Sequence, residues 1–120
     1  PVISQPKRHT GQPSLEKPVH RKLAKGNIII DARIDLHNMT QSVAHHRLAN
    51  FLADCRNQSL RHVLVITGKG QTSGGDGILK RMVPVWLTTE PMKSEISGFS
   101  SSARHHGGEG ALYVRLKKQR

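Results

Sequence analysis

A carboxylate and an imidazole stand two residues apart in the segment Asp35-Leu36-His37. The residues here alternate between apolar and polar from Ile34 onward, which predicts a strand. Residues two apart on a strand share a face, so both polar side chains can act on one substrate group. A free imidazole has a pKa of about 6.5, which suits proton transfer near neutrality. Asp35 and His37 are therefore the first candidates for catalysis, although a lone histidine at a strand end is structural just as often.

A glycine-rich loop is the second candidate. It covers residues 68–77, follows an apolar, β-branched run at residues 61–67, and precedes a helix expected to begin near Ile78. The loop matches neither the Walker motif, because Lys69 is followed by glycine, nor the dinucleotide fingerprint. Backbone N–H groups at a helix N-terminus, together with Lys69, can still hold one phosphate. The alternative is that these glycines serve the turn alone.

The elements expected around these residues follow the order β-α-β-α-β-β. Apolar residues recur on one helical face between Gln41 and Asn57, with Thr40 as the expected N-cap. Alternation predicts further strands at residues 96–100 and 111–117. A strand–helix–strand order predicts a parallel pair with a right-handed crossover. The expected fold class is α/β, a two-layer sandwich in which two helices cover one face of a mixed four-stranded sheet.

The same alternation assigns side chains to the two sheet faces. The apolar residues expected to face the helices are Ile34, Leu36, Leu112, Val114 and Leu116. The residues expected on the open face are Arg33, Asp35, His37, Tyr113, Arg115 and Lys117. Ligands gather beyond the carboxyl ends of parallel strands. If the last strand runs antiparallel, the loop at residues 105–110 reaches that edge as well, so three polar or glycine-rich segments converge there.

The composition favours a polyanionic partner. Lys and Arg total 19 against 8 acidic residues, a formal net charge of +11 in 120 residues, and nucleic acid is the simplest partner for such a surface. The apolar runs fall far short of the ~20 residues that a bilayer span needs, so no membrane partner is expected. Cys55 is the single cysteine, which excludes an intrachain disulfide and a cysteine-based zinc site and suits the cytoplasm. The histidines have no zinc-binding spacing, so no metal site is expected.

The first 26 residues differ from the rest of the chain. They hold six basic residues, one acidic residue and four prolines, with little apolar surface to offset the entropy of ordering. We expect a flexible basic arm over residues 1–26 and one folded domain over residues 27–120. Contacts from such an arm to phosphates would raise affinity without sequence preference. The alternative is a solvated linker.

Three segments of the chain resemble the Smr (small MutS-related) domain family. They are Asp35-Leu36-His37 with Met39-Thr40, residues 63–70, and residues 106–114, in the family's order over roughly residues 32–117. The resemblance implies a sandwich like the C-terminal domain of translation initiation factor three. It also implies endonuclease activity, since some members cut DNA, including branched forms, and others cut RNA. Some cut messenger RNA on stalled ribosomes, which makes the ribosome an implied partner.

The resemblance assigns cleavage to Asp35 and His37, and it matches the family's Gly-Lys-Gly to Gly68, Lys69 and Gly70. Where the family usually has glycine after the histidine, this chain has Asn38. Asparagine tolerates positive φ, so the turn should survive.

The resulting hypothesis is a nucleic-acid endonuclease. His37 acts as general acid and base, Asp35 orients it, and Lys69 with the backbone N–H groups of residues 68–70 stabilises charge on the phosphate. Residues expected to bind phosphate or nucleic acid are Gly68, Gly70, Arg104, His106, Gly107, Gly108, Gly110, Arg33, Arg115 and Lys117. Two-metal nucleases need clustered carboxylates, and few stand near Asp35. We therefore expect cleavage without metal or with one weakly held magnesium ion.

Two alternatives stay open. One is a non-catalytic nucleic-acid-binding module, because fold does not fix function. The other is an enzyme acting on a small phosphate compound, which a mononucleotide would saturate. The sequence favours neither DNA nor RNA and gives no oligomeric state.

Overall fold

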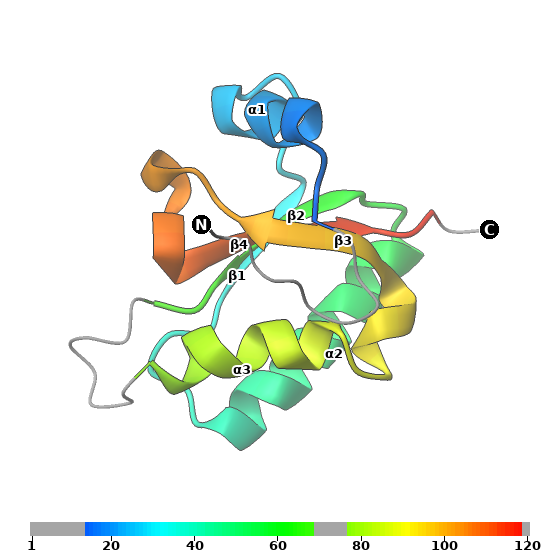
Figure 1. Ribbon diagram of the computed structural model, residues 1–120. Coiled ribbons are helices and arrows are strands. Elements are labelled where there is room, and N and C mark those ends of the chain that lie inside the picture. Colours follow the sequence, from blue (N-terminus) through cyan, green and yellow to red (C-terminus); the bar gives the residue numbers. More distant parts are fainter. Residues whose placement is uncertain (1–13, 69–76, 119–120) are drawn as a thin grey trace.

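A mixed four-stranded sheet forms the centre of the computed structural model, which describes residues 14–68 and 77–118 apart from the side chain of Glu109 (Figure 1). The strands are β1 (Ala32–Asp35), β2 (His62–Ile66), β3 (Ile96–Ser101) and β4 (Ala111–Leu116), in the spatial order β1-β2-β4-β3. β1 and β2 are parallel, and β4 is antiparallel to both β2 and β3. This arrangement confirms the predicted mixed sheet.

Two helices, α2 (Gln41–Asn57) and α3 (Ile78–Leu87), cover one face of this sheet (Figure 1). The Thr40 hydroxyl accepts a hydrogen bond from the Val43 N–H at 3.2 Å, so the predicted N-cap of α2 is present. The main core lies between the helices and the sheet. Its buried members include Leu36, Ala44, Leu48, Leu52, Val63, Val65, Leu79, Val83, Leu87, Val114 and Leu116. Short 3-10 turns make up η1 (Met92–Glu95), η2 (Arg104–His106) and η3 (Gly108–Gly110).

The opposite sheet face, which the sequence led us to expect open, is covered by a third helix, α1 (Lys17–Lys25) (Figure 1). Pro18 stands in its first turn and Gly26 ends it with φ +80°. A second core forms beneath it, with the buried residues Leu15, Leu23, Leu64, Ala111 and Tyr113. Tyr113 is 1% exposed here instead of lying on an open face.

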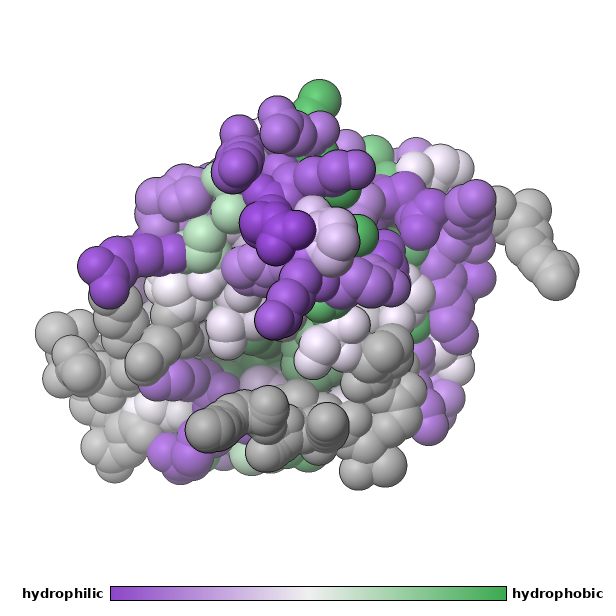
Figure 2. Space-filling model, turned by 45° about the horizontal axis from the view of Figure 1, so that its top comes forward, coloured by the Kyte–Doolittle hydropathy of each residue, from purple (hydrophilic) through white to green (hydrophobic). Residues whose placement is uncertain are grey.

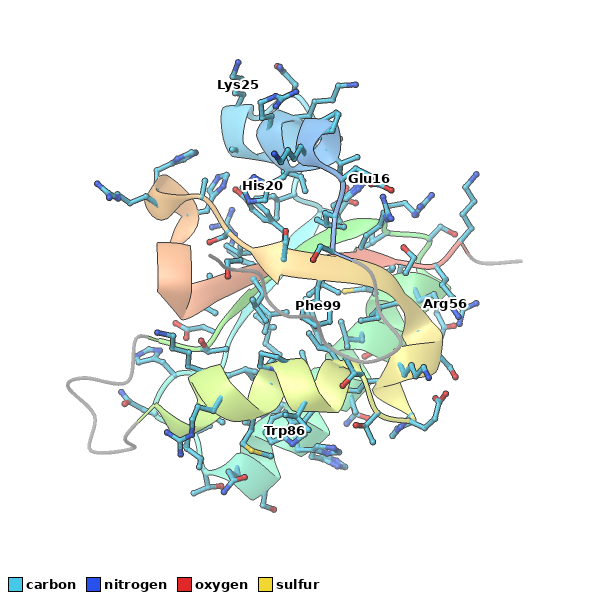
Figure 3. All side chains as sticks on the ribbon, viewed as in Figure 1. Glu16, His20, Lys25, Arg56, Trp86 and Phe99 are labelled. Carbon is cyan, nitrogen blue, oxygen red and sulfur yellow. The ribbon has the colours of Figure 1, made fainter. Side chains whose placement is uncertain are left out.

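Hydrogen bonds also join α1 to the rest of the fold. They run from His20 Nε2 to the Ser101 carbonyl at 2.8 Å, from His105 Nε2 to the Ala24 carbonyl at 2.6 Å, and from Arg115 Nη1 to Glu16 Oε1 at 3.1 Å. In Figure 3, His20 lies between α1 and the sheet, whereas Lys25 points away from it. Residues 14–26 are thus packed and partly helical, unlike the flexible arm expected there. The rest of that expected arm, residues 1–13, lies outside the described residues.

Within the described ranges, no helix is long and apolar enough to cross a bilayer.

Candidate active site

Asp35 and His37, here named the Asp–His pair, are in direct contact at the end of β1. Asp35 Oδ1 lies 2.5 Å from His37 Nδ1 and also accepts the backbone N–H of His37 at 3.1 Å. Asn38 turns the chain immediately afterwards with φ +67°. The side chains of His37 and Asp35 are 54% and 49% exposed, so a large substrate can reach both. Because Nδ1 is taken by the carboxylate, Nε2 is the nitrogen left to act on a substrate.

The pKa of Asp35 is below its ordinary value. Burial of the carboxyl group acts to raise this pKa, but the hydrogen bonds from the side chain and backbone of His37, with the charge of the ring, lower it by more. Asp35 is therefore a carboxylate at neutral pH. A carboxylate accepts hydrogen bonds and does not donate them, so it fixes the proton of His37 on Nδ1.

The end of β2 lies against this pair. Gly68 has φ +80°, and a Cβ atom built on it would be 3.1 Å from the Cβ of His37. The backbone N–H groups of Thr67 and Gly68 both donate to the carbonyl of Gly110, at 2.8 and 3.0 Å. The structure thus brings Gly68 and the loop before β4 to the edge of the sheet where the Asp–His pair stands. Lys69 and Gly70 lie outside the described residues.

The backbone N–H groups of Gly68, Gly107, Gly108 and Gly110 are already paired within the fold, which differs from the phosphate-binding role expected for them. Besides Gly68, the pairs are Gly107 to the Arg104 carbonyl at 3.0 Å, Gly108 to the Ala103 carbonyl at 2.9 Å, and Gly110 to the Gly107 carbonyl at 2.8 Å. These N–H groups hold the shape of the loop and are not open donors for phosphate oxygen.

Arg33 and His106 lie near each other on the α1 side of β1. Arg33 precedes Asp35 by two residues and is exposed like it, so the two share a strand face. The pKa of His106 is lowered first by burial and then by the charges of His105 and Arg33. Arg104 is exposed in the same turn, η2. Arg33, Arg104 and His106 therefore lie near one another, and their contact with nucleic acid stays a prediction.

Arg115 and Lys117 are not brought to this edge, and their contact with nucleic acid stays a prediction. Because β4 runs antiparallel to β2, Arg115 is paired with His62, the first residue of β2, at the opposite end of the sheet. Its guanidinium is also occupied: Nη1 donates to Glu16 and Nε donates to the Ser97 hydroxyl at 2.8 Å. Lys117 follows beyond that end of the strand.

No group of three or more His, Cys, Asp or Glu side chains that could hold a metal ion occurs in the part of the chain that the structure describes. Cys55 is buried on the sheet-facing side of α2, and burial raises the pKa of its thiol. It is a core residue, as its position on the apolar face predicts.

Sequence reasoning missed helix α1, which covers the second face of the sheet. The signal was the spacing of Leu15, Val19 and Leu23, four residues apart, which marks one helical face. The cations of α1 are exposed on the outer side; they are Lys17, Arg21, Lys22 and Lys25. Figure 2, which turns the α1 side toward the reader, shows mostly hydrophilic residues over it.

A mixed β-sheet, an exposed Asp–His pair at the carboxyl end of its parallel strands and a basic helix on the second sheet face define a small, strongly basic α/β domain. The chain matches the model of the Smr domain over residues 34–117, and it belongs to that family. The predicted family is therefore confirmed.

The curated relatives include the ribosome rescue factor SmrB of Tolumonas auensis. It is 33% identical over 98 residues, which are 82% of this chain and 52% of the relative. SmrB of Photobacterium profundum is 35% identical over 94 residues, 78% of this chain and 49% of the relative. The chain thus spans about half the length of these relatives.

Two solved structures have the same fold. YdaL, a stand-alone small MutS-related protein from Escherichia coli, is 31% identical with a TM-score of 0.63, covering 88% of this chain and 79% of that one. The Smr domain of Thermus thermophilus MutS2 has a TM-score of 0.62 at 22% identity, covering 72% and 98%, which is a likeness of fold alone. They confirm the fold class, while the likeness to initiation factor three stays a prediction.

Proposed function

We propose that this Smr domain is an endonuclease that breaks phosphodiester bonds in nucleic acid, with Asp35 and His37 as its catalytic residues. The observation that supports this most is the 2.5 Å contact between Asp35 Oδ1 and His37 Nδ1 at an edge where both side chains are about half exposed. Such a contact fixes the imidazole tautomer and leaves Nε2 for proton transfer.

On RNA, His37 Nε2 would take the proton of a 2′-hydroxyl as its oxygen attacks the adjacent phosphorus. The bond from phosphorus to the 5′-oxygen then breaks, which leaves a 2′,3′-cyclic phosphate, and the leaving 5′-oxygen takes a proton from water. On DNA, which lacks that hydroxyl, water is the nucleophile. Lys69 is proposed to stabilise the charge that develops on the phosphate.

The net charge of +11 and the exposed cations of α1 support binding to a polyanion. Relatives named ribosome rescue factors favour RNA at a ribosome as the substrate to test first. The cytoplasmic location expected from the sequence stays a prediction.

The test is cleavage of end-labelled RNA, supercoiled plasmid and branched DNA, with and without EDTA. His37→Ala should abolish cleavage while binding, followed by fluorescence anisotropy, stays within about twofold. His46→Ala, an exposed histidine on α2, is the matched control and should cut normally. Undiminished cleavage by His37→Ala would refute the assignment, and loss of activity in EDTA would show a need for a divalent ion.

A non-catalytic binding module is the second candidate, and the paired N–H groups of the loop favour it, because they leave fewer donors for a developing oxyanion. It would show salt-sensitive binding to all three substrates and turnover of none.

A further inference from the structure

A pocket of about 260 Å³ opens between the end of α1, β1 and η2. It is lined by Leu23, Gly26, Ile28, Ile29, Ile30, Arg33 and His106. Four of the seven lining residues are aliphatic, and the polar side chains are one guanidinium and one imidazole. Ile29 at this pocket is 73% exposed, one of the few large apolar side chains left in water in the described chain.

The pocket lies along β1 from the Asp–His pair, on the strand face that Arg33 and Asp35 share. Arg33 lines it and precedes Asp35 by two residues on the same face of β1, which corresponds to ~6.6 Å along the strand. One nucleotide of an extended strand can span that length. A polynucleotide with one phosphate at the Asp35 end of the Asp–His pair would therefore bring a neighbouring base to the pocket.

The polar groups of the pocket are hydrogen-bond donors. His106 Nδ1 lies 2.5 Å from the hydroxyl of Tyr113, and that hydroxyl already accepts the Ala103 N–H at 3.2 Å. Tyr113 is buried, so its hydroxyl proton needs an acceptor, and Nδ1 is the acceptor within reach among the described residues. His106 is then a neutral ring with its hydrogen on Nε2, which agrees with the lowered pKa of His106. Arg33 also carries donors alone.

We propose that this pocket holds one unpaired nucleobase next to the phosphate on which Asp35 and His37 act. The proposal rests on the proposed function for its place beside that phosphate. Aliphatic side chains contact the faces of the ring, and the imidazole of His106 and the guanidinium of Arg33 donate to its edge. Two neighbouring donors favour a base with two neighbouring acceptors, which guanine presents as O6 and N7 and adenine does not.

Binding without cleavage tests the pocket directly. The protein is His37→Ala, and the ligand is a fluorescent nine-nucleotide single-stranded RNA in which one abasic residue is moved through every position. At one position the missing base should weaken binding about tenfold, a usual effect for one stacked base. When Ile29→Asp is added to the protein, the same abasic residue should weaken binding by less than twofold. Val85→Asp is the matched control, a 48% exposed side chain on α3, and should keep the tenfold effect.

The identity of the base is tested in the same assay. RNA with guanine at the position that is sensitive to Ile29→Asp should bind about tenfold more tightly than RNA with adenine there. Arg33→Lys, which keeps the charge and loses the planar fork, should remove that preference. Equal affinities for the guanine and adenine RNAs in His37→Ala would contradict the proposal that Arg33 and His106 recognise the guanine edge.

Three results separate this proposal from the proposed function. Abasic penalties that are the same with and without Ile29→Asp would overturn the pocket. The base whose removal weakens binding only when Ile29 is intact should lie within one nucleotide of the bond that the unsubstituted protein cuts. A greater separation would overturn the placement of the pocket beside the reacting phosphate. If the unsubstituted protein cuts nothing and the coupling is present, the nuclease assignment fails and the base pocket stands.

Discussion

A Cβ atom at Gly68 would lie 3.1 Å from the Cβ of His37. Gly68, two residues after the end of β2, therefore lies against the proposed acid–base residue, and the absence of a side chain on Gly68 leaves room for His37. The positive φ of +80° adds a second reason for glycine, since a side chain there is strained.

Replacing Gly68 with alanine should cost about 1–2 kcal/mol of unfolding free energy from the left-handed backbone and displace His37. Gly26→Ala is the control, because Gly26 has the same φ and nothing within 4 Å of its Cβ. Urea denaturation should show a loss for both variants, at least as large for Gly68→Ala as for Gly26→Ala. NMR signals of the His37 ring should shift in Gly68→Ala alone; unchanged signals there would refute the contact.

The lowered pKa of Asp35 predicts how the Asp–His pair contributes to stability. A depressed carboxyl pKa stabilises the fold above the ordinary value of about 3.9 and stops doing so as the pH falls through the lowered value. Unsubstituted protein should therefore exceed Asp35→Asn in unfolding free energy at pH 7, by less than about 1 kcal/mol because the pair is half exposed. Denaturant titrations should show the two proteins converging in acid. A gap that widens in acid contradicts the prediction.

His106 should make the fold less stable in mild acid. Its lowered pKa means that the unfolded chain takes up the proton first, so the stabilising contribution is present above about pH 6.5 and is lost as the pH falls through the lowered value. The stability of the unsubstituted protein relative to His106→Gln should thus fall between pH 7.5 and pH 5. Chemical denaturation at several pH values measures this difference, in which the contributions of the other histidines cancel. A rise on acidification would show that the folded state favours the charged ring.

The packing of α1 can be tested at Leu23, which is 1% exposed. Leu23→Ala should lower the unfolding free energy by about 2–4 kcal/mol, the usual cost of a buried leucine. Lys22→Ala, an exposed neighbour, should change it by less than about 0.5 kcal/mol. Equal effects of the two variants in urea would mean that α1 is not part of the cooperative unit.

The cations of α1 should appear in the salt dependence of binding. Deleting residues 1–26 would also uncover the second core, so neutral substitutions are the cleaner change. Lys17→Gln with Arg21→Gln and Lys25→Gln should weaken binding and reduce the slope of log affinity against log salt by about 0.9 for each duplex phosphate that the protein no longer neutralises. Arg47→Gln, exposed on α2, is the control. An unchanged slope in the triple variant would exclude α1 from the interface.

Local patterns predicted the two-layer part of this fold because each element there carries its own signal. Residues 41–57 show a helical face, and β4 shows alternation, so the structure has them where the sequence placed them. The Asp–His contact was predictable as well, since a spacing of two on a strand needs no knowledge of distant residues.

Long-range packing explains what the sequence did not reveal. Prolines and charges dominate residues 1–26, and they concealed the apolar stripe of Leu15, Val19 and Leu23. Without that helix, Tyr113 would be a surface residue. The alternation of side chains along a strand places Arg115 on the same sheet face as Arg33. The antiparallel direction of β4 then places Arg115 at the opposite end of the sheet from the Asp–His pair. The backbone N–H groups of the glycine-rich loops donate to carbonyls that only the folded loops bring within reach, so the sequence could not show that these donors are occupied.

The Smr match begins at Ile34, yet Leu15 and Leu23, which cover Tyr113, come before it. A polypeptide trimmed to the matched region would keep Asp35 and His37. It would expose the apolar sheet face around Tyr113 to solvent, and exposed apolar patches promote self-association. Poor solubility of that fragment would reflect the missing cover and would say nothing about catalysis.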